Sequence, residues 1–223
     1  MNTFVQAALL GWGTLCGLDL VSVPQMMIAR PLVAGAFAGA ILGDVETGLR
    51  VGVLFELFQF DILPVGAARY PEYGPATVAA VAAAYGARGG FGLGVIVGLL
   101  TALLGGSSLQ LLRRLNARAA NRSLASIEAG DATALVRVHV AGIARDGVRA
   151  LLVTAAGLGL ATLARTMLLP ALSVRTLTLV GVAGAAGALA AATAGTLRLV
   201  GWGRPLTWLA LGLGGGAALV WLR

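Results

Sequence analysis

Polar side chains interrupt the apolar N-terminal third of the chain at short intervals. They are carboxylates and amides, followed by a bend of proline and glycine: Asp19, Gln25, Asp44, Glu56, Gln59, Asp61 and Leu63-Pro64-Val65-Gly66. Such groups exchange hydrogen bonds with vicinal hydroxyls, so a cluster of them in a dry cavity suits a sugar or another neutral polyol. A positively charged ligand would suit the same cluster. The sequence therefore predicts a site for a small polar molecule, with these substrate contacts: Asp19, Gln25, Glu56, Asp61, Pro64 and Gly66.

Some of these polar residues also suit a purely structural role. Glu46 and Arg50 lie four positions apart, the spacing at which an acid and an arginine pair on a helix. Asp44 follows a glycine and suits the cap of a new helix. We therefore interpret this segment as a structural turn, made by Gly43, Asp44, Thr47 and Gly48. An arginine, a helix end or a ligand hydroxyl could each supply the partner that Glu56 needs among its apolar neighbours.

The chain carries no motif of a metal-dependent or nucleophilic enzyme. HExxH, paired cysteines, a Walker loop and a nucleophile elbow are all missing from the sequence. The one cysteine, Cys16, lies in an apolar run and is expected to pack there. The one histidine, His139, lies in a basic segment before an apolar run, where we interpret it as a helix-end or interface residue. We expect no catalytic residue, no metal site and no cofactor.

The composition indicates an integral membrane protein. Of the 223 residues, 58% are hydrophobic and only 11% are charged, whereas a soluble domain carries about a quarter charged residues. Charge-free runs cover 89–112, 176–197 and 205–222, which compare with the roughly 20 apolar residues needed to cross a bilayer. These features exclude a disordered chain, a secreted disulfide scaffold and a nucleic-acid-binding domain. All 16 cations are arginine, and most lie between apolar runs. Their distribution there indicates how the chain is oriented in the membrane.

The first 75 residues are expected to form broken helices and re-entrant hairpins rather than simple spans. Their apolar runs are interrupted at Arg30-Pro31, at 44–48 and at 61–64. Six of the nine acidic residues lie before residue 73, and a charge at the centre of a bilayer costs about 2.5 to 3.5 kcal/mol. Short pieces of this kind build the binding sites of transporters. We predict an all-α integral membrane protein, with transmembrane helices after this N-terminal third.

A basic segment divides the chain into three expected regions. Residues 113–149 carry seven of the 16 arginines, which predicts a cytoplasmic position, and the first part of this segment is interpreted as an interfacial helix at headgroup level. The region 1–112 would then be a membrane region that holds the hairpins and the sugar-binding core. The region 113–149 would be a basic cytoplasmic linker, and 150–223 would form C-terminal transmembrane helices.

Five short motifs occur in order within about the first 85 residues: Gly17-Leu18-Asp19; Gln25 with Ala29-Arg30-Pro31-Leu32-Val33-Ala34-Gly35; Leu42-Gly43-Asp44-Val45-Glu46-Thr47-Gly48; Leu54-Phe55-Glu56-Leu57; and Leu63-Pro64-Val65-Gly66-Ala67-Ala68. Their order and spacing resemble the IIC membrane subunit of the mannose-sorbose family of the bacterial sugar phosphotransferase system. The segment Val138-His139-Val140 adds a weaker likeness, and the last third is similar in hydropathy. The chain departs from the family at Asp61, where glycine is common, and at Tyr70-Pro71-Glu72, where the family has a Pro- or Ala-Pro-Asp stretch.

The resemblance implies a division of labour between subunits. In that family IIC pairs with a second membrane subunit, IID, in a trimer of heterodimers, and a sugar-binding core moves like an elevator against a trimerising scaffold. The phosphoryl group comes from a phosphohistidine on a separate IIB subunit, which IIA charges. The resemblance therefore implies that this chain binds a hexose and carries it across the inner membrane. It implies contact with membrane lipid, no phosphohistidine on this chain and no nucleic-acid partner.

Two other classes of protein stay open on the residues alone. An ion-coupled secondary transporter would use Glu56 and Asp61 as titratable sites within the membrane, and it would need neither IIB nor IID. A non-transporting scaffold or sensor of the same fold would keep the polar cluster as a remnant. Neighbouring genes for IIA, IIB and IID would favour group translocation over both.

Overall fold

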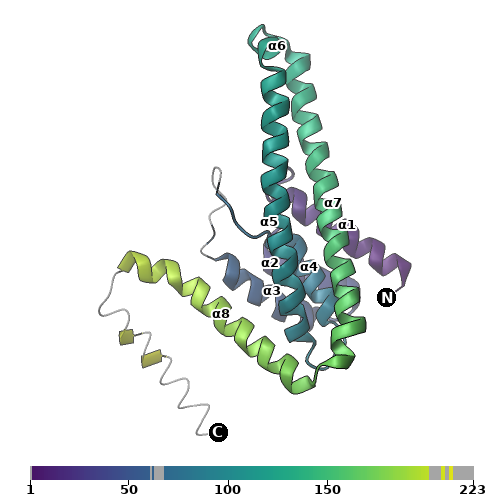
Figure 1. Cartoon of the computed structure of the whole chain (residues 1–223), viewed down its shortest axis with the longest axis vertical. Coiled ribbons are helices and arrows are strands. Elements are labelled where there is room, and N and C mark those ends of the chain that lie inside the picture. Colours follow the sequence, from purple (N-terminus) through teal and green to yellow (C-terminus); the bar gives the residue numbers. More distant parts are fainter. Residues whose placement is uncertain (1, 61, 63–67, 201–206, 209–210, 213–223) are drawn as a thin grey trace.

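The computed structural model describes residues 2–60, 62, 68–200, 207–208 and 211–212, and most of them are helical (Figure 1). Among these residues there is no β-strand, which confirms the predicted all-α class. The helices are α1 (Thr3–Asp19), α2 (Pro31–Leu42), α3 (Val45–Gln59), α4 (Tyr73–Ala84), α5 (Gly90–Arg122), α6 (Leu124–Glu128), α7 (Ala132–Ala171) and α8 (Val174–Val200).

The short helix α4 lies at the centre of the protein. Each of its 12 residues is buried, and α1, α2, α3, α5 and α7 all pack against it. Its residues are mostly alanine, valine and glycine, so it is apolar on every side, as expected of a helix enclosed by others. At 1.5 Å per residue it is about 18 Å long, which is too short to cross a hydrocarbon core of roughly 30 Å.

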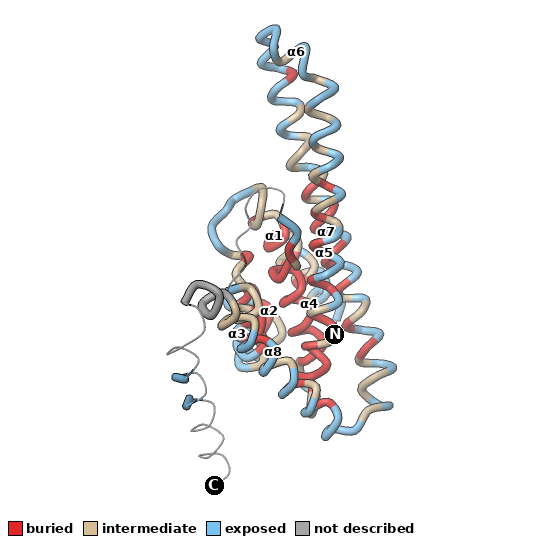
Figure 2. The backbone as a smooth tube through the Cα atoms, turned by 60° about the vertical axis from the view of Figure 1, so that its left-hand side comes forward, coloured by how far each residue is buried: buried red, intermediate tan, exposed pale blue. Residues whose placement is uncertain are grey.

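The two longest helices, α5 and α7, run antiparallel and are joined through α6 at one end (Figure 1). They contain 33 and 40 residues, or about 50 and 60 Å of helix, well beyond the roughly 30 Å of a bilayer core. Figure 2 shows that buried residues gather along the half of the pair beside α4, whereas the half near α6 is largely exposed. Each helix is thus long enough to cross a bilayer and extend beyond it.

The expected boundaries of the basic segment fall inside these long helices. Residue 112 lies within α5 and residue 149 within α7, so 113–149 continues the two helices and the α6 turn instead of forming a separate linker. The physical reason is that residues 111–122 are leucine, arginine, alanine and asparagine without glycine or proline. Leucine, arginine and alanine favour helix, so a change from apolar to basic composition does not end it. The cytoplasmic position of this segment stays a prediction.

Short, broken helices make up the N-terminal third, as the sequence predicts. Helix α1 ends at Asp19, α2 begins at Pro31, α3 begins at Val45 and α4 begins at Tyr73. Proline at the first position of α2 is favourable because its missing N–H needs no partner there. The breaks in the helices therefore coincide with the prolines, glycines and acids that interrupt the apolar runs.

Helices α2 and α3 form a tight hairpin. Gly43 ends α2 in the left-handed conformation, with φ of 73°, which glycine adopts without strain. Glycines also line the contact between the two helices: a Cβ on Gly48 would lie 2.3 Å from the backbone oxygen of Gly35, and one on Gly35 would lie 2.5 Å from the oxygen of Gly48. Only small residues permit this approach, so the hairpin depends on them.

Among the described residues, three helices are long and apolar enough to cross a membrane: Gly90–Arg122, Ala132–Ala171 and Val174–Ala194. The third belongs to α8, which packs against α3 and α5. Only 17% of its most apolar window is buried within the chain, and Leu179, Val182 and Leu189 are exposed on it. This surface suits lipid or another membrane helix. The further span expected at 205–222 lies mostly outside the described residues.

Candidate functional site

Asp19 organises the loop between α1 and α2. Its carboxylate is 3% exposed and accepts hydrogen bonds from the N–H groups of Met26, at 2.6 Å, and Ala29, at 3.0 Å. The loop needs this support because Gln25 and Met27 both have positive φ, of 60° and 64°, which is unfavourable for side-chain-bearing residues. Because each oxygen accepts a bond from the backbone, Asp19 positions this loop. Its contact with a substrate stays a prediction.

Glu56 reaches the same part of the chain from α3. It accepts a hydrogen bond from the Arg30 guanidinium and another, at 3.1 Å, from the N–H of Leu32. Leu32 is in the first turn of α2, where N–H groups lack partners within the helix and carry partial positive charge. An arginine and a helix end, two of the three possible partners of Glu56, are therefore present.

The predicted contacts Asp19, Gln25 and Glu56 thus gather around residues 19–32. Gln25 is exposed on the loop that Asp19 holds, and the side chains of Glu56 and Arg30 are 20% and 43% exposed. The loop and the facing part of α3 therefore present an amide, a carboxylate and a guanidinium that a ligand can reach. The remaining predicted contacts, Asp61, Pro64 and Gly66, lie outside the described residues.

The other predicted cluster lies at the opposite end of α2. Gly43 and Asp44 connect α2 to α3, and the Asp44 carboxylate accepts from the N–H of Thr47 at 3.0 Å. This bond favours the ionised acid and lowers its pKa. Glu46 and Arg50 form an exposed ion pair. The 12 residues of α2 separate this turn from the Glu56 end by about 18 Å, so the acids of the N-terminal third do not form one cluster.

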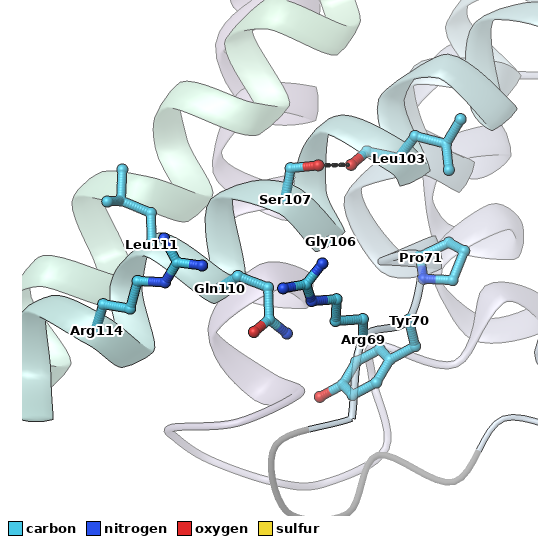
Figure 3. A pocket seen from close by; sticks show the side chains of 9 residues that line it. All are labelled: Arg69, Tyr70, Pro71, Leu103, Gly106, Ser107, Gln110, Leu111 and Arg114. Atoms are coloured by element: carbon cyan, nitrogen blue, oxygen red, sulfur yellow. Dashed lines mark hydrogen bonds between the residues drawn. The ribbon is translucent and has the colours of Figure 1, made fainter.

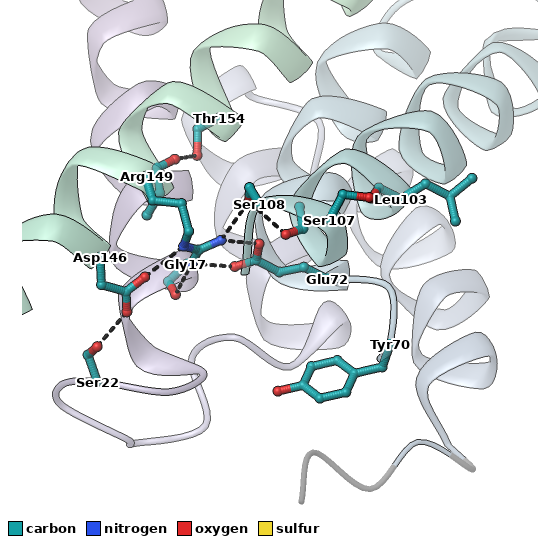
Figure 4. Close-up of polar contacts among 12 residues, drawn as sticks. Gly17, Ser22, Tyr70, Glu72, Leu103, Ser107, Ser108, Asp146, Arg149 and Thr154 are labelled. Atoms are coloured by element: carbon teal, nitrogen blue, oxygen red, sulfur yellow. Dashed lines mark hydrogen bonds and ion pairs between the residues drawn. The ribbon is translucent and has the colours of Figure 1, made fainter. Parts of the chain in front are cut away.

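Three buried charged residues, Glu72, Asp146 and Arg149, form a network that the sequence alone does not predict. Arg149 lies between Asp146 and Glu72, with its Nε 2.7 Å from Asp146 and its two Nη atoms 2.5 and 2.9 Å from the Glu72 oxygens (Figure 4). Both carboxylates are 0% exposed. The fork of the guanidinium thus binds Glu72 through two bonds, the geometry in which arginine is strongest.

Backbone and hydroxyl groups complete this network. Arg149 donates to the Gly17 carbonyl at 3.1 Å and lies 3.4 Å from the Ser108 hydroxyl, while the Ser22 hydroxyl donates to Asp146. The contacts link the end of α1, the start of α4, α5 and α7. No described buried polar side-chain atom is left without a partner, as expected of a buried ionic group that stabilises a fold.

A sequence signal for this network exists, but it is weak. Glu72 directly precedes a charge-free run, and Asp146 and Arg149 are three apart just before another, so each charge needs a partner inside the protein. Nothing in the spacing tells which of seven arginines in 113–149 faces inward. Glu72 and Arg149 are 77 positions apart, so only the folded chain pairs them.

Membrane-crossing helices, shorter buried helices and a satisfied buried ion network together define a multi-pass helical membrane protein. A family model described as the sorbose-specific IIC component of the phosphotransferase system matches residues 4–212. The chain belongs to this family.

Two curated relatives give the same family. The mannose-specific EIIC component of Escherichia coli strain K12 is 22% identical over 146 residues, which are 66% of this chain and 52% of that protein. The fructose permease IIC component of Bacillus subtilis strain 168 is 27% identical over 125 residues, 56% of this chain and 46% of that protein. The chain thus spans about half the length of the curated relatives it matches.

Two solved structures share the fold. One is described only as a membrane protein and superposes with a TM-score of 0.69; the other is the mannose transporter ManYZ in complex with microcin E492, with a TM-score of 0.57. Each is 18% identical and is matched over 97% of this chain and 87% of the solved one. The likeness therefore extends over nearly the whole chain described here.

Proposed function

We propose that the chain is the sugar-translocating IIC subunit of a phosphotransferase-system permease, and that it binds a hexose and carries it across the inner membrane for phosphorylation by a separate IIB subunit. The observation that carries this proposal is the family match over residues 4–212. The mannose and fructose specificities of the two relatives support a hexose as the ligand class.

The proposed sugar contacts are Gln25, on the loop that Asp19 supports, and Glu56, which reaches this loop from α3. An exposed amide beside a partly exposed acid–arginine pair offers donors and acceptors that match vicinal hydroxyls. Glu56 also accepts a bond from the start of α2. A sugar hydroxyl bonded to Glu56 would therefore lie where α2 begins and α3 ends. Asp61, Pro64 and Gly66 follow α3 closely in the sequence and are proposed as further contacts.

The proposed partners are a IID membrane subunit, in a trimer of IIC–IID heterodimers, and the IIB and IIA phosphocarriers. The fold likeness to the mannose transporter ManYZ supports a second membrane subunit. The exposed apolar face of α8, with Leu179, Val182 and Leu189, supports the same proposal. Such a face requires lipid or protein against it.

Uptake of labelled mannose and fructose in cells that carry the partner subunits tests the function and the site together. Glu56→Gln and Gln25→Ala should each lower uptake about ten- to hundredfold, the effect of losing roughly 1.5 to 3 kcal/mol from a hydrogen bond to a charged group. Glu46→Gln is the matched control, because that acid is exposed in the first turn of α3, at the opposite end of the α2–α3 hairpin, and its one partner among the described residues is Arg50.

The controls separate the competing classes. Uptake should require IIB, and each variant should still reach the membrane in normal amount. Uptake that persists without IIB and stops when the ion gradient is collapsed would instead show an ion-coupled transporter. If both site variants transport as well as the parent, Glu56 and Gln25 do not contact the sugar.

A further inference from the structure

A pocket lies on α5, and none of its lining residues belongs to the loop that carries Gln25. Its volume is about 390 Å³, and the segment 69–71 forms one wall while one face of α5 forms the other (Figure 3). The lining residues are Arg69, Tyr70, Pro71, Leu103, Gly106, Ser107, Gln110, Leu111 and Arg114. Two of the nine are arginines, and none is acidic.

The two walls are held together by specific contacts. A Cβ on Gly106 would lie 2.3 Å from the carbonyl oxygen of Tyr70, so only glycine at this position lets the segment 69–71 lie directly against α5. Gln110 donates to the Ala68 carbonyl at 3.2 Å, and Arg113 donates to the same carbonyl at 2.8 Å and to the Tyr70 hydroxyl at 2.9 Å. The pocket is therefore built by the fold.

These contacts bring the side chains of Arg69 and Arg114 into one pocket. Figure 3 shows the two guanidinium groups converging on either side of Gln110. Both arginines are exposed, and within the described part of the chain neither makes an ion pair or side-chain hydrogen bond. Arg113 adds a third positive charge at the edge. Three cations without an acid among the lining residues leave the pocket strongly positive.

We propose that this pocket binds a phosphate group. A guanidinium presents a planar fork of donors that matches phosphate oxygens through paired bonds, and two forks facing one space can share the oxygens of one phosphate. A pocket of this volume falls within the usual range of about 300 to 1,000 Å³ for small-molecule sites, so it has room for a sugar beside the phosphate. Ser107 and Gln110 add polar groups on the same wall.

Three sources can supply this chemistry: inorganic phosphate, a hexose phosphate and the headgroup of an anionic phospholipid. A hexose phosphate is the source that follows from the proposed function, since it is the product of group translocation. The pocket itself rests on Arg69 and Arg114 and not on that function.

The test uses the full chain in phosphatidylcholine nanodiscs. Binding of inorganic phosphate and of mannose 6-phosphate is measured by broadening of their phosphorus NMR signals, and retention of phosphatidylglycerol is measured by native mass spectrometry in mixed-lipid discs. The variants are Arg69→Gln, Arg114→Gln and the pair together. Arg118→Gln is the matched control, because Arg118 is exposed one turn further along α5 and does not line the pocket.

At least one probe should bind the parent and the Arg118→Gln control equally, and each pocket variant should weaken that binding about ten- to hundredfold. The probe that responds identifies the source. The proposal is overturned if no probe binds the parent, or if the pocket variants and the control weaken binding alike. Binding of inorganic phosphate does not require sugar transport, so a chain that binds phosphate through Arg69 and Arg114 but does not take up sugar would contradict the sugar-transport proposal alone.

Discussion

Replacing Arg149 by methionine is expected to destabilise the protein more than any other single arginine replacement on α7. Two buried carboxylates, Glu72 and Asp146, share the one guanidinium, for a formal charge of −1 in the group. Without it the charge becomes −2 at positions that are 0% exposed. Breaking a buried ion pair by removing one partner costs about 3 to 5 kcal/mol, because the carboxylates cannot recover their hydration.

This loss of stability can be measured as a decrease in the apparent melting temperature of the purified protein in detergent. For a chain of this size about 1 kcal/mol corresponds to roughly 2 to 4 °C, so Arg149→Met should lower the apparent Tm by about 6 to 20 °C. Glu72→Gln should have a smaller effect, because it leaves one neutral pair, Arg149 with Asp146.

The matched control is Arg145→Met, one turn earlier on the same helix. Arg145 is half-buried, and within the described part of the chain its side chain donates to Asn116 alone, at 2.8 Å, so its loss should cost about 0.5 to 1.5 kcal/mol. Melting of Arg149→Met within about 2 °C of the parent would refute the expected cost of the buried carboxylates. Equal effects of the two replacements would refute it too, since a shared loss of about 1 kcal/mol would mean that burial adds nothing.

Three further predictions concern the hairpin and the topology. Asp44→Ala should lower the apparent Tm by a few degrees through the loss of about 0.5 to 2 kcal/mol of helix capping, and Asp44→Asn should restore most of it; equal melting of all three would contradict the capping role. Gly48→Ala should cost about 1 to 3 kcal/mol by forcing α2 and α3 apart, whereas Gly11→Ala, with nothing within 4 Å, should be neutral or stabilising. Cysteine at Ser123 should react with a membrane-impermeant maleimide only in inverted vesicles, with the fully buried Cys16 as an unreactive background; labelling of intact cells would place this end of α5 outside.

The helix breaks could be predicted because they depend on local chemistry. Proline at 31, glycine at 43 and the acid that follows it each have one favoured place relative to a helix end, and the chain uses them there. The length of α5 could not be predicted in the same way. A change from apolar to basic residues marks where the surroundings change, but backbone hydrogen bonds continue wherever helix-forming residues follow one another.

The candidate site could be predicted only in part, for a related reason. The sequence showed that Glu56 required a partner and identified the types of partner that would serve, and two of those types are present, Arg30 and the N-terminus of α2. The distance between Asp44 and Glu56 could not be predicted from the sequence. It depends on how α2 and α3 pack in the hairpin, which places the two acids at opposite ends. In the sequence, Arg149 has the same charge as its neighbours and nothing distinguishes it from them, although its environment differs from that of the exposed Arg118.

Arginine therefore has two different roles in this protein, one in stability and one in the proposed binding of phosphate. The hydrogen-bond partners of each arginine side chain show which role it has. Arg149 places all its nitrogens against groups of the protein itself, so no donor is left for a ligand and its loss should appear in stability. Arg69 and Arg114 place theirs in a pocket without an acid among its lining residues, so their charge is uncompensated by the protein around them. Removing like charges that face one another relieves repulsion, so these two replacements should leave the fold intact while binding is lost. Stability and binding should thus respond to different arginines of the same chain.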